Sequence, residues 1–417
     1  MALTKTKIQG FLHSGGSIAV AMAIMSVATY GFTMVAARLL GPRPYGAIAS
    51  LMAVLLVVGV LSLGLQATAA RRISAEPEHV AQIERVIMAV TYRAALVLGL
   101  VLLAAAPLID RILRLHSLPT AAMVAATAVP LTIMGGQAGI LQGERRWWPL
   151  GVLYVASGVP RFAIGTALMA WRPTETWAMV AVLIGSFVPV LIGAYALRHD
   201  RSPAEDTALH GQVAILRETG HNSQALLAFF TLSNLDVIIA RNVLDPHEAG
   251  LYAGGLILTK AVLFLPQFVV VIAFPSMSTA AERRRSLLRS LGLVAMLGVA
   301  CTAGVIVLHD IAMIFVGGDK YAAIESKLWL FAVLGTALSM LQLLVYAVLA
   351  RQGRLSTYVV WVAVIALVGL GLTVADTLTG LLVIVSVIDG LLLAALLGFS
   401  LWRLGEHSPT PEAAPTA

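Results

Sequence analysis

The chain has 417 residues, of which 59% are hydrophobic and 12% are charged, and its mean hydropathy is +0.90. Soluble domains are about 45–50% apolar and about 25% charged, so an apolar fraction this large cannot be hidden in soluble cores. Soluble enzymes, nucleic-acid-binding proteins and disulfide-built secreted modules are therefore excluded. The only cysteine, Cys301, lies in an apolar run, so an intrachain disulfide is excluded as well.

Twelve apolar segments are long enough to cross a membrane, which takes roughly 20 residues in a helix. The first, 16–37, follows Lys5 and Lys7 and is longer than the apolar region of a cleaved signal peptide, so we expect it to stay as a membrane helix. Lipid cannot satisfy backbone hydrogen-bonding groups, and the segments lack the alternation of barrel strands. The sequence thus predicts an all-α integral membrane protein with about 12 transmembrane helices, over residues 16–37, 46–66, 88–109, 120–141, 150–170, 177–197, 224–244, 249–273, 290–316, 328–349, 357–376 and 380–402.

The basic residues indicate how these helices are oriented. The net charge is +7, and most Lys and Arg residues lie in short connections between the apolar segments. If the N-terminus is cytoplasmic, the inner connections hold seventeen Lys and Arg residues and the outer ones hold eight. Inner loops are enriched in positive charge. We therefore expect both termini in the cytoplasm and a location in the bacterial cytoplasmic membrane.

Two similar segments indicate an internal duplication. Residues 37–46 read ARLLGPRPYG after the first span, and residues 240–250 read ARNVLDPHEAG after the seventh. Six spans per half give both halves the same orientation, so the repeats are parallel. We expect two lobes around a central cavity, with a cytoplasmic N-terminus at 1–15, an N-terminal six-helix lobe at 16–197, a cytoplasmic linker at 198–223, a C-terminal six-helix lobe at 224–404 and a disordered cytoplasmic tail at 405–417.

Five ionisable residues fall within the predicted spans, where a charge is costly unless it faces a cavity or finds a partner. Arg161, Asp236, Lys260 and Asp389 lie near the predicted bilayer centre, and Arg93 lies closer to the cytoplasmic edge. A cationic interior suits a phosphate-bearing substrate. Arg161, Lys260 and Arg93 are therefore candidates for substrate binding, with snorkelling of Arg93 to the interface as its alternative.

The two carboxylates allow more than one interpretation. Asp236 precedes Lys260 by one helix at similar depth, so either an ion pair with Lys260 or a role in ion coupling is open. Asp389 has no evident partner in the sequence. It could take part in ion coupling, or it could be a hydrogen-bonded carboxyl between packed helices.

Prolines and glycines inside the spans have structural explanations. Pro130, Pro160, Pro189 and Pro266 can kink their helices, which transporters use as flexing points and ordinary membrane helices also tolerate. Three glycines recur at four-residue spacing on the fourth span, and internal helix packing is their expected use. They are Gly135, Gly139 and Gly143.

Catalytic motifs are absent from the sequence. It holds no phosphate-binding loop, no cluster of histidines or carboxylates with metal-ligand spacing, and no support for a Ser-His-Asp arrangement. The outer connections are too short for a catalytic domain. We expect no enzyme activity, no metal and no cofactor, and a membrane position leaves no nucleic-acid partner.

The duplicated segments resemble a known family. Residues 36–47 (AARLLGPRPYGA) look like the first hairpin of bacterial polysaccharide-biosynthesis membrane proteins of the O-antigen-flippase type, within the multidrug/oligosaccharidyl-lipid/polysaccharide (MOP) exporter superfamily. Residues 234–237 (NLDV), 248–252 (EAGLY) and 264–267 (FLPQ) are similar to its seventh and eighth spans, and 141–143 (LQG) fits its connection between spans 4 and 5. The resemblance extends over residues 15–400.

This resemblance implies a lipid flippase that moves polyprenyl-diphosphate-linked oligosaccharides outward by alternating access, coupled to an ion or to the membrane potential. Its implied partners are the lipid-linked oligosaccharide, membrane lipids and the glycosyltransferases or polymerase of the same pathway. Two alternatives stay open: a drug/cation antiporter of the multidrug branch, and a membrane scaffold without transport. The related lipid II flippases carry arginine where this chain has Phe32, and they tend to have fourteen spans, which argues against lipid II as cargo.

Overall fold

The computed structural model describes residues 15–198, 212–263, 280–349 and 354–405, and within these ranges the chain is helical, without a strand. Pro266, residues 1–14 and the tail after residue 405 lie outside them, as does most of the predicted linker. The N-terminal half comprises α2 (Gly15–Leu40), α3 (Pro42–Val58), α4 (Val60–Ala75), η1 (Pro77–His79), α5 (Val80–Ala104), α6 (Ala106–Leu113), α7 (Leu118–Gly143), α8 (Trp147–Trp171) and α9 (Glu175–Ala196). The C-terminal half comprises α10 (Gln212–Val243), α11 (Pro246–Leu263), α13 (Ala280–Val307), α14 (His309–Val316), η4 (Asp319–Lys327), α15 (Leu328–Leu349), α16 (Arg354–Thr373) and α17 (Leu378–Gly405).

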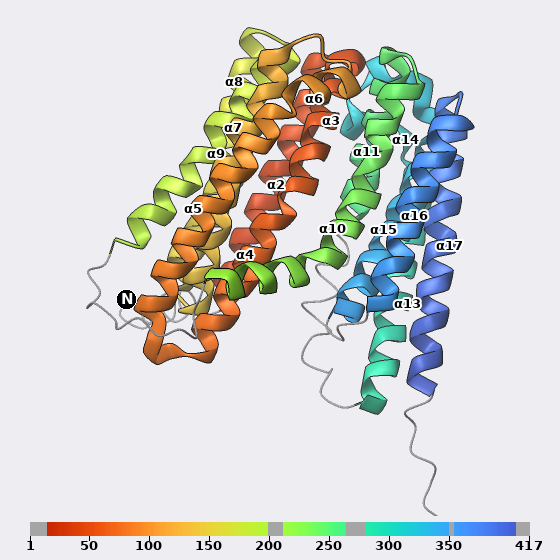
Figure 1. Cartoon of the computed structure of the whole chain (residues 1–417). Coiled ribbons are helices and arrows are strands. Elements are labelled where there is room, and N and C mark those ends of the chain that lie inside the picture. Colours follow the sequence, from red (N-terminus) through yellow and green to blue (C-terminus); the bar gives the residue numbers. More distant parts are fainter. Residues whose placement is uncertain (1–14, 199–211, 264–279, 350–353, 406–417) are drawn as a thin grey trace, which may run out of the picture.

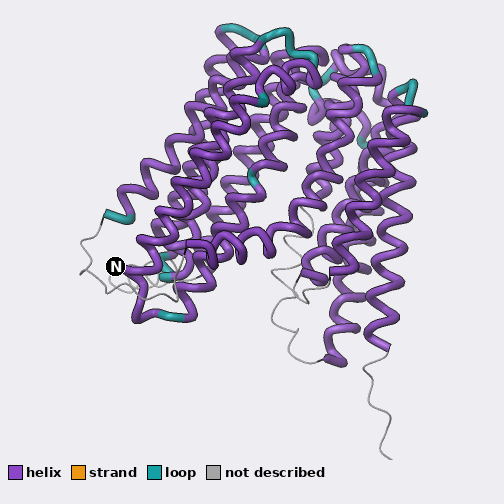
Figure 2. The backbone as a smooth tube through the Cα atoms, viewed as in Figure 1, coloured by secondary structure: helices purple, strands orange, loops and turns teal. Residues whose placement is uncertain are grey.

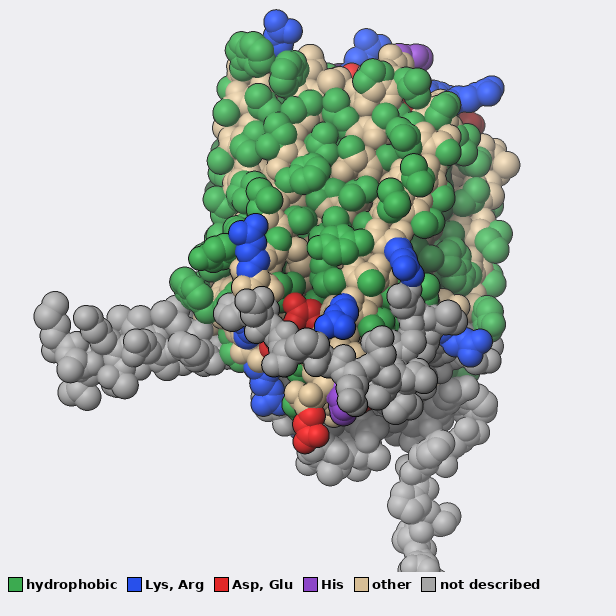
Figure 3. Space-filling view, turned by 60° about the vertical axis from the view of Figure 1, so that its left-hand side comes forward, with side chains coloured by type: hydrophobic (Ala, Val, Ile, Leu, Met, Phe, Trp, Pro, Cys, Tyr) green, Lys and Arg blue, Asp and Glu red, His purple; other side chains and the backbone are tan. Residues whose placement is uncertain are grey.

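Eleven of the twelve predicted spans fall on a helix or on two consecutive helices, and the described part of the span 249–273 falls on α11. Ten helices of the described ranges are long and apolar enough to cross a membrane, and Thr357–Thr373 is a shorter apolar helix. Helix α11 is described as far as Leu263, where the described range ends. Figure 3 shows a hydrophobic belt, with basic and acidic side chains gathered mainly toward its two ends. The chain is therefore an all-α, multi-pass membrane protein.

The two halves form separate helix bundles that meet at one end and diverge at the other (Figure 1). We call the end where they meet the outer end, after the predicted topology, and the other the inner end. The inner end carries the turn between α4 and α5, and the outer end carries the turns after α2 and α10. This arrangement is that of two bundles closed against each other on one side of the membrane.

The duplicated segments pack against each other at the outer end. A Cβ atom on Gly46 would lie 2.9 Å from Gly250 Cα, and a Cβ on Gly250 would collide with the carbonyl oxygen of Pro42. Gly46 and Gly250 occupy corresponding positions in the two repeats, so the repeats contact each other through the same residue. We call this contact the glycine seam.

Basic and phenolic side chains reinforce the outer end by donating to backbone carbonyls of the opposite half. Arg241 is buried and donates to Leu113 O (2.8 and 3.0 Å) and to Arg114 O (3.0 Å). In the other direction, Lys320 Nζ donates to Arg38 O (3.1 Å) and Tyr321 Oη donates to Ala37 O (3.3 Å). The last carbonyls of a helix lack intrahelical partners, so each half caps helix ends of the other.

Helix α10 joins the two halves at the inner end. Its first turns lie across the base of the N-terminal half, and the rest rises into the C-terminal half (Figures 1 and 2). Glu218 accepts hydrogen bonds from Arg71 Nε and Arg72 Nε, each at 3.0 Å, and Thr219 donates to Thr68 (3.3 Å). Residues 212–223, predicted as linker, are thus the start of a helix fastened to α4.

The predicted glycine packing on α7 is confirmed. Cβ atoms on Gly135, Gly139 and Gly143 would each contact the facing helix α4, and the one on Gly139 would lie 2.8 Å from Gln66 Cα and 2.7 Å from Ala69 Cβ. Backbone atoms cannot move aside as the end of a flexible side chain can. The three glycines therefore set the distance between α4 and α7.

We expect Gly139→Ala to lower the thermal unfolding temperature of the purified protein, because overpacking between two helices costs about 1–3 kcal/mol. Gly292→Ala on α13 is the matched control, since no atom of the described residues lies within 4 Å of its added Cβ. That control should unfold at or slightly above the wild-type temperature. Equal unfolding temperatures for the two variants would contradict the packing role of Gly139.

Candidate functional site

Arg161 lies on α8 at the contact with α2. Gly158, one turn earlier, would place a Cβ 2.8 Å from the carbonyl oxygen of Met25, so α8 and α2 approach closely here. Arg161 Nη2 donates to Thr29 Oγ1 at 2.7 Å, and its guanidinium carbon lies 5.6 Å from the ring centroid of Phe32. The aromatic face and the hydroxyl hold the cation in one orientation.

Most of the donor capacity of Arg161 is unused. A guanidinium has five N–H donors, and among the described residues Arg161 makes one hydrogen bond, to Thr29. Its Nε is buried and has no partner within the described ranges. Arginine forms short, strong hydrogen bonds with phosphate oxygens. The arrangement therefore offers unused donors to an anionic group at the contact between α8 and α2.

The C-terminal half holds a second polar cluster. Lys260 Nζ donates to Asn234 Oδ1 at 3.0 Å, and Tyr252 Oη donates to Asp236 Oδ2 at 3.0 Å. Asp389 is 1% exposed, its Oδ1 has no hydrogen-bond partner in the described part of the chain, and its charge would interact with that of Asp236. The cluster thus places one basic and two acidic side chains within the core of this half.

The direct Asp236–Lys260 ion pair that the sequence left open does not form. No contact within 4.0 Å joins their charged atoms among the described residues, and Lys260 bonds to the amide of Asn234 instead. Asp236 takes its hydrogen bonds from Tyr252 and from the backbone N–H of Val237 (2.8 Å). Its carboxylate is therefore held by neutral donors.

Arg93 does not join either cluster. It is exposed on α5, a helix that packs chiefly against α7 and α4 and has no extensive contact with α8 or α11. An exposed position on an outer helix agrees with snorkelling, the alternative raised for this residue. The structure therefore brings together Lys260, Asp236 and Asp389, and places Arg161 in the opposite half.

Several residues of these clusters were not predicted from the sequence. Thr29, Phe32, Asn234 and Tyr252 are uncharged, and so they carry no signal when a sequence is searched for charges inside spans. Two signals were available: Asn234 and Tyr252 lie in segments that carry the family resemblance, and Thr29 and Phe32 are three residues apart and so lie on one face of α2.

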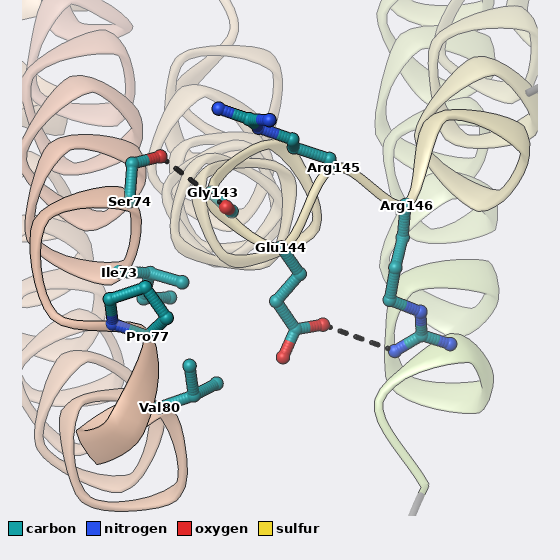
Figure 4. Close-up of a pocket in the computed structure, with 8 residues that line it drawn as sticks. All are labelled: Ile73, Ser74, Pro77, Val80, Gly143, Glu144, Arg145 and Arg146. Atoms are coloured by element: carbon teal, nitrogen blue, oxygen red, sulfur yellow. Dashed lines mark hydrogen bonds and ion pairs between the residues drawn. The ribbon is translucent and has the colours of Figure 1, made fainter. Parts of the chain in front are cut away.

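A surface pocket of about 680 Å³ lies at the inner end of the N-terminal half (Figure 4). Its apolar wall comes from α4, η1 and α5, and the turn between α7 and α8 supplies its polar groups. Arg146 pairs with Glu144 (3.4 Å) and caps the carbonyl of Ala196 at the end of α9 (2.7 Å). Arg146 thus joins the α7–α8 turn to the end of α9 at this pocket.

Three exposed side chains at the outer end also come together. The potential ligand atoms of His309, Asp310 and Glu325 all lie within 4.8 Å of one another. The sequence did not predict this cluster, because Glu325 follows fifteen residues after Asp310. His309 lies 3.4 and 3.6 Å from the two carboxylates, so the cluster is a solvated set of ion pairs when the histidine is protonated.

The fold is similar to solved structures of membrane transporters. The lipid II flippase MurJ in an inward closed conformation aligns with a TM-score of 0.72 at 13% identity, covering 92% of this chain and 87% of that one. An inward-facing multidrug resistance MATE transporter of the MOP superfamily aligns at 0.69 and 16% identity, covering 94% and 100%. The eukaryotic MATE transporter AtDTX14 aligns at 0.68 and 12% identity, covering 96% of each chain. At such identities the likeness shows the fold alone, which is that of these transporters.

Sequence comparison shows the family directly. No curated protein sequence matches the chain significantly. Residues 11–281, well over half of the chain, match the family described as Polysaccharide biosynthesis protein. This match covers both duplicated segments and includes Arg161, Asp236 and Lys260, in agreement with the resemblance seen in the sequence. The chain belongs to the polysaccharide biosynthesis protein family.

Proposed function

We propose that this protein is a flippase that carries a polyprenyl-diphosphate-linked oligosaccharide across the bacterial cytoplasmic membrane for cell-surface polysaccharide assembly. Membership of the polysaccharide biosynthesis family supports the pathway, and the transporter fold supports movement of a substrate. The observation that carries the proposal is the underused guanidinium of Arg161, which lies where α8 contacts α2 and whose Nε is buried without a partner among the described residues. A diphosphate supplies the acceptors that this group lacks.

Transport follows from rocking of the two halves. In the structure the outer end is closed by the glycine seam and by cross-half hydrogen bonds, and the bundles diverge toward the inner end. A substrate built on the cytoplasmic face would enter between the halves, bind through Arg161 and Lys260, and leave when the outer end opens. Asp236 and Asp389 would couple this cycle to a cation or to the membrane potential.

The second candidate function is drug/cation antiport, which the buried carboxyls favour. Asp236 and Asp389 are both buried in the C-terminal half, and Asp389 Oδ1 lacks a partner among the described residues. Such carboxyls can bind a cation or a proton. In this case the cationic Arg161 would be a structural residue, and the protein in liposomes would expel cationic dyes under a proton gradient.

The double variant Arg161→Ala, Lys260→Ala tests the flippase proposal. We expect polysaccharide export to fall by at least about 100-fold in a strain that depends on this protein, since each of the two lost charged hydrogen bonds costs about 1.5–3 kcal/mol. Arg93→Ala, on an outer helix, should cause the smaller loss. Undiminished export by the double variant would show that the cationic groups do not carry substrate, and dye expulsion without lipid transport would favour the antiporter.

A further inference from the structure

Three polar side chains in the N-terminal half form a cluster that the proposed transport cycle does not use. Gln66 on α4 donates through Nε2 to Gln142 Oε1 on α7 (2.9 Å) and to Tyr154 Oη on α8 (2.7 Å). The cluster thus links three helices without any charge. Gln142 is exposed, and Gln66 and Tyr154 are half-buried, so a solute can reach these side chains.

The cluster keeps unused hydrogen-bonding capacity of both kinds. The two N–H bonds of Gln66 are occupied, which leaves its carbonyl oxygen as an acceptor, the amide of Gln142 with two donors, and the hydroxyl of Tyr154 with one donor. No other partner for these groups occurs among the described residues. The hydrogen bonds between these side chains link the helices. The donors and the acceptor that remain match a ligand rich in groups that both donate and accept.

The cluster lies in line with Arg161. Tyr154 and Arg161 are seven residues apart on α8, which places them on one face and separates them by about 10 Å along the helix axis. Helix α8 starts at the inner end with Trp147, so Tyr154 lies nearer than Arg161 to that end. The cluster is therefore about the reach of a short sugar chain from a diphosphate bound at Arg161.

We propose that Gln66, Gln142 and Tyr154 form a neutral subsite for the sugar part of the lipid-linked oligosaccharide, with the diphosphate at Arg161. Sugar hydroxyl and acetamido groups donate and accept hydrogen bonds, and the cluster offers both functions. Its lack of charge separates sugar recognition from phosphate binding. This inference rests on the proposed flippase function.

The experiment measures binding of two lipids to the full-length protein in nanodiscs. One lipid is the native lipid-linked oligosaccharide isolated from cells that lack this protein, and the other is undecaprenyl diphosphate. We expect Tyr154→Phe and Gln142→Leu each to weaken binding of the oligosaccharide lipid by about tenfold, with unchanged affinity for undecaprenyl diphosphate. Tyr92→Phe is the matched control, because it removes the same hydroxyl from an exposed position on α5, and it should bind both lipids normally.

The other outcomes overturn the subsite. Equal losses for both lipids would mean that the cluster only holds α4, α7 and α8 together, and unchanged binding of both would mean that it touches no sugar. A wild-type protein that binds the two lipids equally well would exclude sugar recognition while leaving the flippase proposal intact. A wild-type protein that binds neither lipid would overturn the flippase proposal itself, and the subsite with it.

Discussion

Gly250→Ala should open the outer end of the molecule and stop transport. The added methyl group would collide with the carbonyl of Pro42 in the other half, where backbone cannot make room. Overpacking of this kind costs about 1–3 kcal/mol. Because the cost arises only when the halves are closed at the outer end, it shifts the equilibrium toward outer-open states by roughly five- to hundredfold.

Spin labels on the two halves measure this opening. Cysteines replacing Arg111 and Ala323, both exposed at the outer end, would carry the labels in a Cys301→Ser background. We expect the distance distribution of Gly250→Ala to move to longer values than that of the parent. Gly255→Ala is the matched control on the same helix, because its methyl would press on Phe331 within the C-terminal half and should leave the distance unchanged. Identical distributions for the two variants would contradict a gate at the glycine seam.

Arg161→Ala should reduce transport at least tenfold, and adding Phe32→Arg should restore part of it. The guanidinium of Arg161 lies over the ring of Phe32, so an arginine at position 32 can bring its charge to nearly the same place from α2. The loss reflects a charged hydrogen bond worth about 1.5–3 kcal/mol. Thr29, which bonds to Arg161, stays available to the relocated guanidinium.

Transport of the native lipid-linked oligosaccharide in proteoliposomes distinguishes the variants. Arg172→Ala is the control, because Arg172 also stacks on an aromatic ring, that of Trp171, at an exposed site at the end of α8. It should transport normally. If the double variant Arg161→Ala, Phe32→Arg folds but transports no more than Arg161→Ala alone, the substrate does not require a positive charge at this place.

The helical segments and the duplication could be predicted because both depend on local composition. Hydropathy places each span, and the repeated ARLLGP and ARNVLDP segments mark equivalent helix ends. The start of α10 was missed because its local composition is mixed. Residues 212–223 alternate between apolar side chains such as the buried Ile215 and charged ones such as Glu218, and an average over a window of 20 residues cancels this amphipathic pattern.

Partners of the buried charges could not be predicted, because they depend on helix rotation. Asn234 and Asp236 are two residues apart and so differ by about 200° around α10. Lys260 can therefore reach only one of them, and the structure selects Asn234. Their positions along the predicted spans placed both Asp236 and Lys260 near the centre of the membrane, which had suggested an ion pair.

The continuity of α10 limits how the two halves can move. Its first turns are fastened to α4 through Glu218 and Thr219, and beyond them Phe229 and Leu232 are buried in the core. Any rocking of the halves must therefore bend α10 between its two attachments or break its contact with α4. Each residue inserted there would turn one attachment by about 100° relative to the other. Only insertions close to whole helical turns would therefore keep the two attachments of α10 facing their present partners.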